Sequence, residues 1–362
     1  MNVIFDTQNI YYLPQYLPVY EELRKRGHEA VFVGFQNKDD QSKVMPIFER
    51  FGLEVVWVNN RDSALEFYLE RKADWVIFGS KVDFLDELHQ VSQSVQLGHG
   101  IGPKPSYYRK SSSAMNVRFI EGALRQQIIQ KMYPNDTFVQ VGYSKLDPLI
   151  QGTEPGLDFK ALGLDESRQT ILYAPTFNPS SLERFPDDWP SHFTEFNILI
   201  KPHSFTYTRK RYHGQRRKLK KWAKFSNTHV AGPQEVSLLP YMKQADILVS
   251  EASSTLFEFV ALDRPVIVCN FFQLKWFYRG PFRYRFERRF SKDNVVYKDI
   301  GQHVASYREL GDALRDELAN PQRFHDSRVQ YTHDHVGPMD GQASARIVDY
   351  LEQHQRTDQP SD

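Results

Sequence analysis

The sequence contains only one cysteine, Cys269, in 362 residues, which excludes a disulfide bond within the chain and a cysteine-based metal site. Because this cysteine lies in an apolar run, residues 265–269, we expect a buried and unreactive thiol. No apolar run approaches the roughly 18 residues of a membrane-spanning helix. The first residues also lack the basic flank and long apolar core of a signal peptide. These absences predict a soluble, cytoplasmic protein.

The chain also has almost no net charge. It contains 46 Lys and Arg residues and 45 Asp and Glu residues, which gives a formal net charge of +1. A protein that binds polyanions over its whole surface is therefore not expected, although local patches can still act. No Walker A loop, HExxH motif or G-x-S-x-G nucleophile elbow occurs. The acidic pairs 39–40 and 187–188 lie in polar, turn-like segments, so we expect neither a metal nor a cofactor.

The chain does contain a regular alternation of short apolar strands and helical periodicity. Strands apolar on both faces that alternate with helices are typical of a parallel sheet covered by helices. The polar, Gly-rich stretch 151–165 divides the series and predicts a linker. The expected strands are residues 2–5, 29–34, 54–58, 75–79, 94–97 and 137–141 before it, and 170–173, 197–200, 246–249 and 265–269 after it.

The predicted fold class is therefore α/β, with two doubly wound Rossmann-like domains that face a cleft. The expected domains are residues 1–152 and residues 153–340, followed by a C-terminal helix and polar tail at 341–362. Ligands of such sheets lie beyond the carboxyl ends of the strands. Residues that directly follow the strands are therefore the candidates for a site.

The tripeptide Gly98-His99-Gly100 follows the fifth expected strand. The glycines leave room for a ligand near the backbone, and an imidazole can take a proton from a hydroxyl group near neutral pH. The alternative is an ordinary histidine in a glycine-rich turn. We interpret His99 as the candidate general base, with Gly100, Ser144 and Lys145 as candidates for the cleft wall.

Three hydroxyl residues, Ser253, Ser254 and Thr255, lie between an apolar strand and an apolar helix. The first N–H groups of a helix point outward at such positions and can bind a phosphate or pyrophosphate. One serine would be enough for an ordinary N-cap, so three hydroxyls favour a ligand. Glu258 lies one turn later on the same side, where it could accept hydrogen bonds from ribose hydroxyls.

Two further strand ends carry candidate residues. Lys201-Pro202-His203 follows one buried strand, and Pro175-Thr176 follows another. A cation and an imidazole beside a phosphate site would offset negative charge on the ligand. We therefore predict that Lys201 and His203 bind phosphate, and that Pro175 and Thr176 contact a nucleotide.

Two basic runs lie in the second half of the chain. Residues 209–224 hold nine Lys and Arg residues and no acid, and residues 275–292 interleave seven with aromatic residues. We predict a basic patch that contacts an anionic acceptor polymer or an anionic membrane surface. A solvated surface is the ordinary alternative, and nucleic acid is not expected as a partner. The patch residues are Arg216, Arg217, Lys220 and Lys221.

The chain resembles the CDP-glycerol glycerophosphotransferase family, the teichoic-acid and capsule polymerases and primases, over roughly residues 90–350. The resemblance implies a GT-B-like fold. It is carried by an ordered set of segments: 96–104 (QLGHGIGPK), 141–147 (VGYSKLD), 171–177 (ILYAPTF), 201–203 (KPH), 245–259 (ADILVSEASSTLFEF), 262–265 (LDRP) and 340–350 (DGQASARIVDY).

The resemblance implies transfer of glycerol phosphate from CDP-glycerol to a hydroxyl of a polymer or primer, with release of CMP. It implies His99 as the base, His203 at the donor phosphates, and Ser253 and Ser254 around the pyrophosphate. The implied partners are the nucleotide-activated donor and an anionic polymer or lipid-linked acceptor, with peripheral contact at the inner face of the cell membrane.

Two alternatives stay open. A nucleotide-sugar glycosyltransferase or epimerase of similar architecture would use the same strand ends. A non-catalytic protein that binds an anionic polymer or membrane would use only the basic runs.

Overall fold

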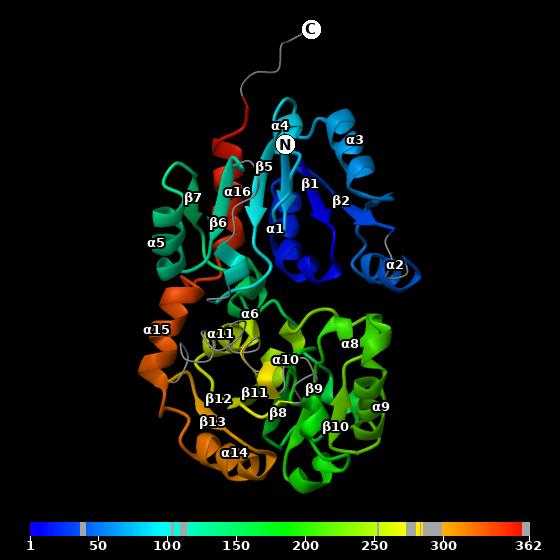
Figure 1. Cartoon of the computed structure of the whole chain (residues 1–362), viewed down its shortest axis with the longest axis vertical. Helices are drawn as coiled ribbons and strands as arrows, with labels where there is room; N and C mark the ends of the chain where they lie inside the picture. The colour runs from blue at the N-terminus through cyan, green and yellow to red at the C-terminus, as the bar shows by residue number, and fades with distance from the viewer. Residues whose placement is uncertain are drawn as a thin grey trace. The chain divides into compact units, whose positions relative to one another are not determined.

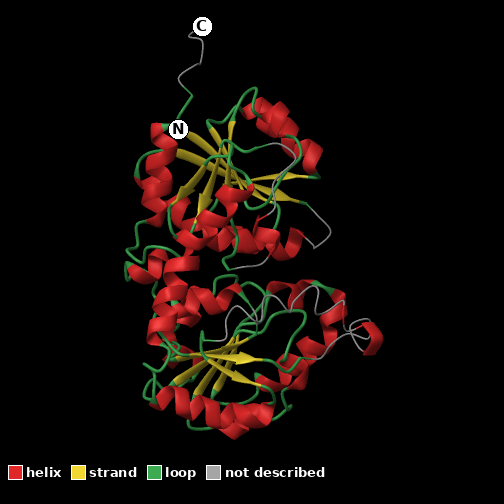
Figure 2. Ribbon diagram, turned by 60° about the vertical axis from the view of Figure 1, so that its left-hand side comes forward, coloured by secondary structure: helices red, strands yellow, loops and turns green. Residues whose placement is uncertain are grey.

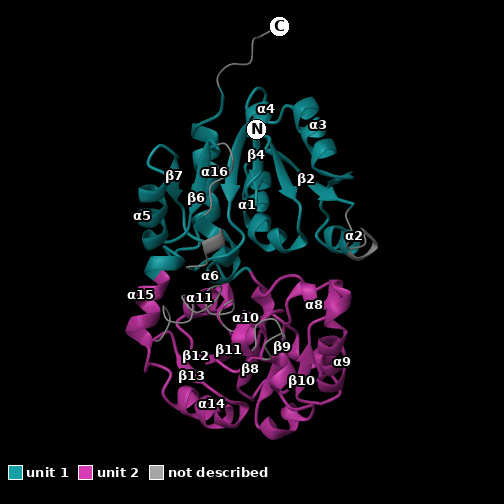
Figure 3. Cartoon of the chain, viewed as in Figure 1, with its two compact units in different colours: residues 1–153, 333–362 teal, residues 154–332 magenta. Residues whose placement is uncertain are grey.

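The computed structural model describes residues 1–36, 41–102, 105–108, 114–251, 253–272, 280–282, 284 and 299–356 (Figure 1). The chain divides into two compact units, each described by itself below (Figure 3). Unit 1 comprises residues 1–153 and 333–362, and unit 2 comprises residues 154–332. Helix α16 (Ala343–Gln353), which the predicted boundaries set apart from both domains, therefore belongs to unit 1.

Unit 1 contains a seven-stranded sheet with strand order β3-β2-β1-β4-β5-β6-β7, and all neighbouring strands are parallel. The predicted strands are all present, and the sequence missed only β6. The strands are β1 (Asn2–Thr7), β2 (Glu29–Phe35), β3 (Val55–Val58), β4 (Trp75–Phe78), β5 (Gln93–Leu97), β6 (Val117–Ile120) and β7 (Phe138–Gln140).

Helices cover both faces of this sheet (Figure 2). They are α1 (Leu13–Lys25), α2 (Gln41–Arg50), α3 (Arg61–Arg71), α4 (Leu85–Leu88), α5 (Ala123–Met132), α6 (Asp147–Ile150) and α16, with the 3₁₀ helices η1 (Ile10–Tyr12), η2 (Pro105–Tyr108) and η3 (Ser144–Leu146). The indole N–H of Trp75 donates to the carbonyl of Leu351 (3.1 Å), and Arg26 pairs with Asp349 and Glu352. These bonds attach α16 to unit 1.

Unit 2 contains a six-stranded parallel sheet with strand order β10-β9-β8-β11-β12-β13. The four predicted strands are present, and the sequence missed the two short strands at the edges, β10 and β13. The strands are β8 (Thr170–Tyr173), β9 (Asn197–Ile200), β10 (Thr228–Val230), β11 (Ile247–Ser250), β12 (Val266–Cys269) and β13 (Gln302–Val304).

The helices of unit 2 also lie on both faces of its sheet (Figure 2). They are α7 (Phe159–Leu162), α8 (Ser204–Thr208), α9 (His213–Trp222), α10 (Leu239–Gln244), α11 (Ser254–Val260) and α14 (Leu310–Ala319), with η4 (Leu182–Arg184), η5 (Trp189–Phe193), η6 (Lys210–Tyr212), η8 (Gly280–Phe282) and η10 (Tyr307–Glu309). Helix α15 (His325–His335) continues from unit 2 into unit 1.

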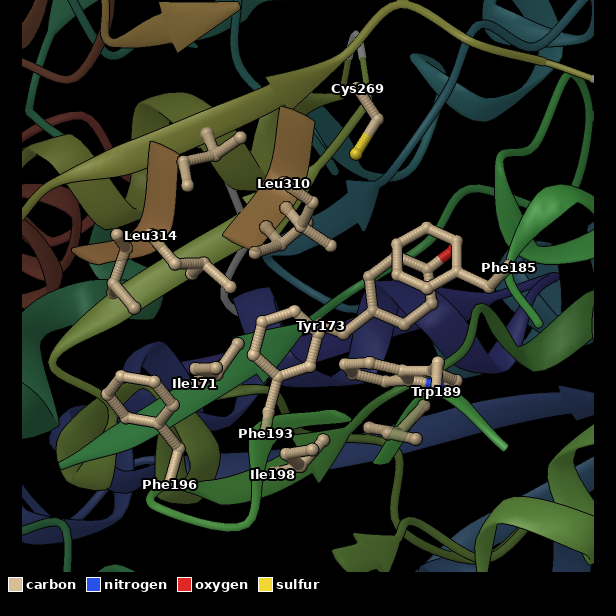
Figure 4. Close-up of a cluster of buried hydrophobic side chains, with 14 of the residues drawn as sticks. Ile171, Tyr173, Phe185, Trp189, Phe193, Phe196, Ile198, Cys269, Leu310 and Leu314 are labelled. Atoms are coloured by element: carbon tan, nitrogen blue, oxygen red, sulfur yellow. The ribbon is translucent and has the colours of Figure 1, made fainter. Parts of the chain in front are cut away.

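An aromatic cluster fills one face of the unit 2 sheet (Figure 4). The rings of Tyr173 and Phe185 stack at a centroid distance of 4.5 Å, and Trp189 meets Tyr173 edge-on at 5.8 Å. Trp222 of α9 is fully buried in the same cluster. Cys269 also belongs to it, is completely buried and is unpaired, which confirms the prediction of a buried thiol.

The strand order of each sheet reverses at one place, between β1 and β4 in unit 1 and between β8 and β11 in unit 2. In doubly wound sheets this reversal opens the crevice in which ligands bind. Ser253 follows β11, Thr176 follows β8, and His99 follows β5, the neighbour of β4. The candidate residues therefore lie at or beside the reversal of their own sheet.

No helix in the described ranges is both long and apolar enough to traverse a bilayer. The second basic run, residues 275–292, lies outside the described residues except for 280–282 and 284.

Candidate functional site

His99 is held at the carboxyl end of β5 by a backbone carbonyl and by aromatic rings. Its Nδ1 lies 2.7 Å from the carbonyl oxygen of Gly79. A carbonyl can only accept, so Nδ1 carries the proton and the neutral ring keeps its basic lone pair on Nε2. The rings of Tyr11 and Tyr12 lie 5.2 and 4.9 Å from the imidazole. This environment fixes the tautomer that a general base requires.

Two glycines near His99, Gly79 and Gly98, lie in close packing. A Cβ atom at Gly79 would lie 2.5 Å from Cδ2 of Tyr12, a separation that real Cβ atoms do not adopt. A Cβ atom at Gly98 would lie 3.1 Å from Oε1 of Glu121. Glycine therefore lets the end of β4 approach Tyr12 and lets the His99 turn approach Glu121.

A buried ion pair that the sequence analysis missed supports the same turn. Glu121 follows β6 and pairs with Arg125 of α5, and both side chains are almost fully buried. Burial raises the pKa of Glu121, and the Arg125 charge partly offsets that rise. Nη2 of Arg125 also donates to the carbonyl of Tyr107 (3.0 Å), whose ring lies 5.9 Å from His99. The signal that could have found this pair is its i,i+4 spacing after a strand.

The three wall residues predicted in unit 1 differ in their burial and contacts. Ser144 is completely buried, accepts a hydrogen bond from the Gln15 amide (3.1 Å) and donates to the Gln15 carbonyl (3.2 Å). These bonds connect η3 to α1. That Ser144 lines a cleft wall stays a prediction. Lys145 beside it is half-buried. Gly100 is buried next to His99.

In unit 2, Ser253 is the N-cap of α11, and its Oγ accepts from the N–H of Thr255 (3.3 Å). One serine thus fills the capping role, as an ordinary helix start would require. Ser254 and Thr255 are half-buried beside it. Glu258, one turn further along, is only 2% exposed. That Ser253, Ser254, Thr255 and Glu258 bind a ligand stays a prediction.

His203 is the N-cap of α8, and its Nδ1 accepts a hydrogen bond from the N–H of Phe205 (3.1 Å). Nδ1 therefore carries no proton, and the neutral ring presents an N–H donor at Nε2. The ring centroid lies 4.7 Å from that of Phe177 and 4.8 Å from that of Phe205, so the three rings form a cluster. Lys201, two residues earlier, is half-buried. His203 and His99 are thus held in opposite tautomers, one suited to donate a hydrogen bond and the other to take a proton.

Glu251, which the sequence analysis did not select, ties together the two strand ends at the reversal of the unit 2 sheet. It follows β11, is 1% exposed, and accepts from the N–H groups of Thr176 and Ser181, each at 2.7 Å. The Ser181 hydroxyl donates to it as well, at 2.5 Å. Burial raises the pKa of Glu251 to about 7, although these donors lower it. This carboxylate holds the backbone of Thr176, and Pro175 beside it is buried.

The predicted basic patch lies on α9. Arg217, Lys220 and Lys221 are exposed, and Lys221 pairs with Asp187 at 2.5 Å. Arg216 differs, because its Nη1 donates to the backbone carbonyls of Thr206 (2.7 Å) and Arg209 (3.0 Å). We therefore assign Arg216 first to holding the end of α8.

His203 caps α8 and is also predicted to bind phosphate, so two substitutions at this position should separate the two roles. His203→Ala should lower the free energy of unfolding by about 1 kcal/mol, since it removes an N-cap, whereas asparagine is itself a good cap and should restore it. On the prediction that His203 binds the phosphates of a nucleotide-activated donor, both variants should weaken donor binding about 10–100-fold, because each would lose a hydrogen bond to a charged group. Denaturant unfolding and donor titration measure the two effects. Unchanged donor affinity in both variants would limit His203 to capping.

Two Rossmann-like sheets, each with polar side chains after the strands at its reversal, define a GT-B-like α/β protein. The prediction of an α/β fold with two doubly wound Rossmann-like domains is confirmed. The family of CDP-glycerol:poly(glycerophosphate) glycerophosphotransferases matches the chain over residues 56–353. The chain belongs to this family and is an enzyme of the CDP-glycerol glycerophosphotransferase class. The resemblance inferred from the ordered segments is confirmed.

Solved structures support the fold. A variant of the wall teichoic acid polymerase TagF is similar with a TM-score of 0.67 and 15% identity, over 98% of this chain and 88% of that one. A TagF variant soaked with CDPG has a TM-score of 0.66 and 14% identity over the same shares. The UDP-GlcNAc 2-epimerase of Neisseria meningitidis, bound to UDP-GlcNAc, has a TM-score of 0.62 and 13% identity, over 98% and 100%. No curated protein sequence matches the chain.

Proposed function

We propose that the enzyme transfers glycerol phosphate from CDP-glycerol to a hydroxyl group of a teichoic-acid-like polymer or primer and releases CMP. The family match supports this reaction class. The observation that carries the assignment of roles is the pair of opposite tautomers, fixed by Gly79 at His99 and by the Phe205 N–H at His203.

In the proposed reaction, the acceptor oxygen attacks the β-phosphorus of the donor. A new phosphorus–oxygen bond forms, and the bond between the β-phosphorus and the bridging oxygen breaks, so CMP leaves with the electron pair. Nε2 of His99 takes the proton of the acceptor hydroxyl, as general-base catalysis requires. The cytidine nucleotide is the activating group, and the enzyme itself needs no covalent intermediate.

Unit 2 holds the donor in this proposal. The Nε2–H of His203 and the ammonium of Lys201 stabilise the charge that grows on the leaving phosphate. The hydroxyls of Ser253, Ser254 and Thr255 contact the pyrophosphate. Glu251 is a positioning residue, because it touches Thr176 and Ser181 rather than the donor. Peripheral contact with the inner face of the cell membrane would bring a lipid-linked acceptor to the enzyme.

A nucleotide panel separates this function from its rival. The fold is shared with UDP-GlcNAc 2-epimerase, so a UDP-sugar enzyme is the second candidate. We expect release of CMP from CDP-glycerol in the presence of a primer, slower release from CDP-ribitol, and no turnover of UDP-GlcNAc. If the protein converted UDP-GlcNAc and did not turn over CDP-glycerol, the chain would be assigned to sugar-nucleotide chemistry instead.

A further inference from the structure

The outer face of α9 carries a continuous row of cationic side chains. Arg217, Lys220 and Lys221 are exposed, as is Lys224 two residues beyond the end of the helix at Trp222, and the imidazole of His213 lies exposed at the start of the helix. With Arg216 they line a hollow of about 440 Å³. Residues three or four positions apart lie on the same side of a helix. Successive basic side chains are therefore spaced by about one turn, roughly 5 Å along the axis.

The opposite face of α9 is committed to the core. Gln215, Leu219 and Trp222 are buried, and the Trp222 indole donates to the carbonyl of Pro186 (3.0 Å). The helix therefore cannot turn its apolar side outward. What it presents to a partner is a set of basic side chains, with their aliphatic stems and charged ends.

Acidic neighbours cancel little of this charge. Asp187 pairs with Lys221, and it lies close enough to Lys218 and Arg217 for their charges to help lower its pKa. Glu183 accepts from the Gln215 amide, and its carbonyl accepts from the half-buried Lys218, so this acid lies on the core side of the helix. Arg217, Lys220 and Lys224 make no ion pair within 4.0 Å in the described part of the chain. Three adjacent cations thus remain for an external partner.

The shape and composition of this face favour a chain over a bilayer. Helices that lie in a membrane interface bury an apolar face in it, and the exposed large hydrophobic side chains of the described residues all lie outside α9: Met45, Phe51, Ile128, Met132, Tyr284 and Val329. A hollow also receives a narrow chain more readily than a flat surface. Charge complementarity then requires an occupant with regularly spaced negative groups.

We propose that the outer face of α9 binds a flexible chain of phosphate groups, the growing poly(glycerol phosphate) acceptor, away from the reacting hydroxyl. The inference rests on the proposed function for the identity of the chain, and on the α9 geometry for the site. It refines the predicted basic patch: Arg217, Lys220 and Lys224 bind the polymer, and Arg216 holds the end of α8. Such a site would keep the product attached between successive transfers.

The test measures binding of inorganic polyphosphate to the full chain without CDP-glycerol, so its result does not depend on turnover. The binding variant is Arg217→Gln, Lys220→Gln and Lys224→Gln. The control variant is Lys131→Gln, Lys160→Gln and Arg308→Gln, which removes the same charge from exposed positions elsewhere. Polyphosphate affinity should fall at least tenfold in the binding variant and less than threefold in the control.

Salt dependence gives a second readout. Each phosphate contact on a flexible chain adds about 0.7 to the slope of log affinity against log salt, so the binding variant should lose about 2 from that slope. Equal losses in both variants, or no polyphosphate binding by the wild type, would overturn the proposal. The proposal would also be overturned if these three residues bound phosphatidylglycerol vesicles while the protein did not bind soluble polyphosphate. The proposed function is tested separately: if it is wrong, the nucleotide panel will show no release of CMP from CDP-glycerol.

Discussion

Replacing His99 by alanine is expected to slow CMP release from CDP-glycerol by about 10²–10⁴-fold, the usual contribution of a positioned general base. The bond from Nδ1 to the Gly79 carbonyl keeps Nε2 as the basic nitrogen, and alanine removes that nitrogen while it leaves unit 2 unchanged. Donor affinity, measured by titration with CDP-glycerol, should therefore stay within about threefold of the wild type.

The same strand supplies the control for this experiment. His89 precedes β5, whereas His99 follows it. Nε2 of His89 lies 2.6 Å from the hydroxyl of Ser94, at the amino-terminal end of this strand. His89→Ala should change CMP release less than threefold. Loss of activity in His89→Ala equal to that in His99→Ala would mean that both act through stability. Activity of His99→Ala within threefold of the wild type would remove His99 as the base.

Glu251→Ala is expected to lower the free energy of unfolding by about 3 kcal/mol at pH 5. The substitution leaves the buried N–H groups of Thr176 and Ser181 without their acceptor, and each such buried group costs about 1–3 kcal/mol. Denaturant unfolding measures the loss. Glu166, an exposed residue of the same unit, gives the control, since Glu166→Ala should change stability by no more than about 0.5 kcal/mol.

The pH dependence of the wild type gives an independent test of this carboxyl group. Burial raises the pKa of Glu251 from 4.5 to about 7, so between these values the folded chain keeps a proton that the unfolded chain has released. Stability must then fall as pH rises through this window, by about 3 kcal/mol at 1.36 kcal/mol per pKa unit. Burial also raises the pKa of Asp6, to about 6. Asp6 therefore also lowers the free energy of unfolding as pH rises.

Glu251→Ala should remove the Glu251 part of this slope and leave the Asp6 part. The difference in stability between variant and wild type should therefore shrink as pH rises from 5 to 8. A difference that is constant across this range would show that Glu251 is ionised at pH 5 in the folded protein.

The strand series and the strand-end candidates could be predicted because both are local properties of the sequence. An apolar run of four to six residues followed by a polar or glycine-rich tripeptide identifies His99, His203 and Ser253 without any long-range information. The order of the strands then places them near the reversal of each sheet, which follows from the connection rules of doubly wound folds.

The features that were missed depend on partners far along the chain. Strand β6 contains Arg118, which reads as an exposed residue, yet it is 2% exposed, with Asp136 at 3.7 Å and the Tyr133 ring beneath its guanidinium. Glu251 is defined by donors about 70 residues earlier in the chain.

The most direct test of the central claim is a crystal structure of the enzyme with CDP-glycerol. We expect the pyrophosphate to contact the hydroxyls of residues 253–255 and Nε2 of His203. The glycerol phosphate should be turned so that an incoming hydroxyl can reach both its phosphorus and Nε2 of His99. A donor bound with its diphosphate remote from either histidine would contradict it.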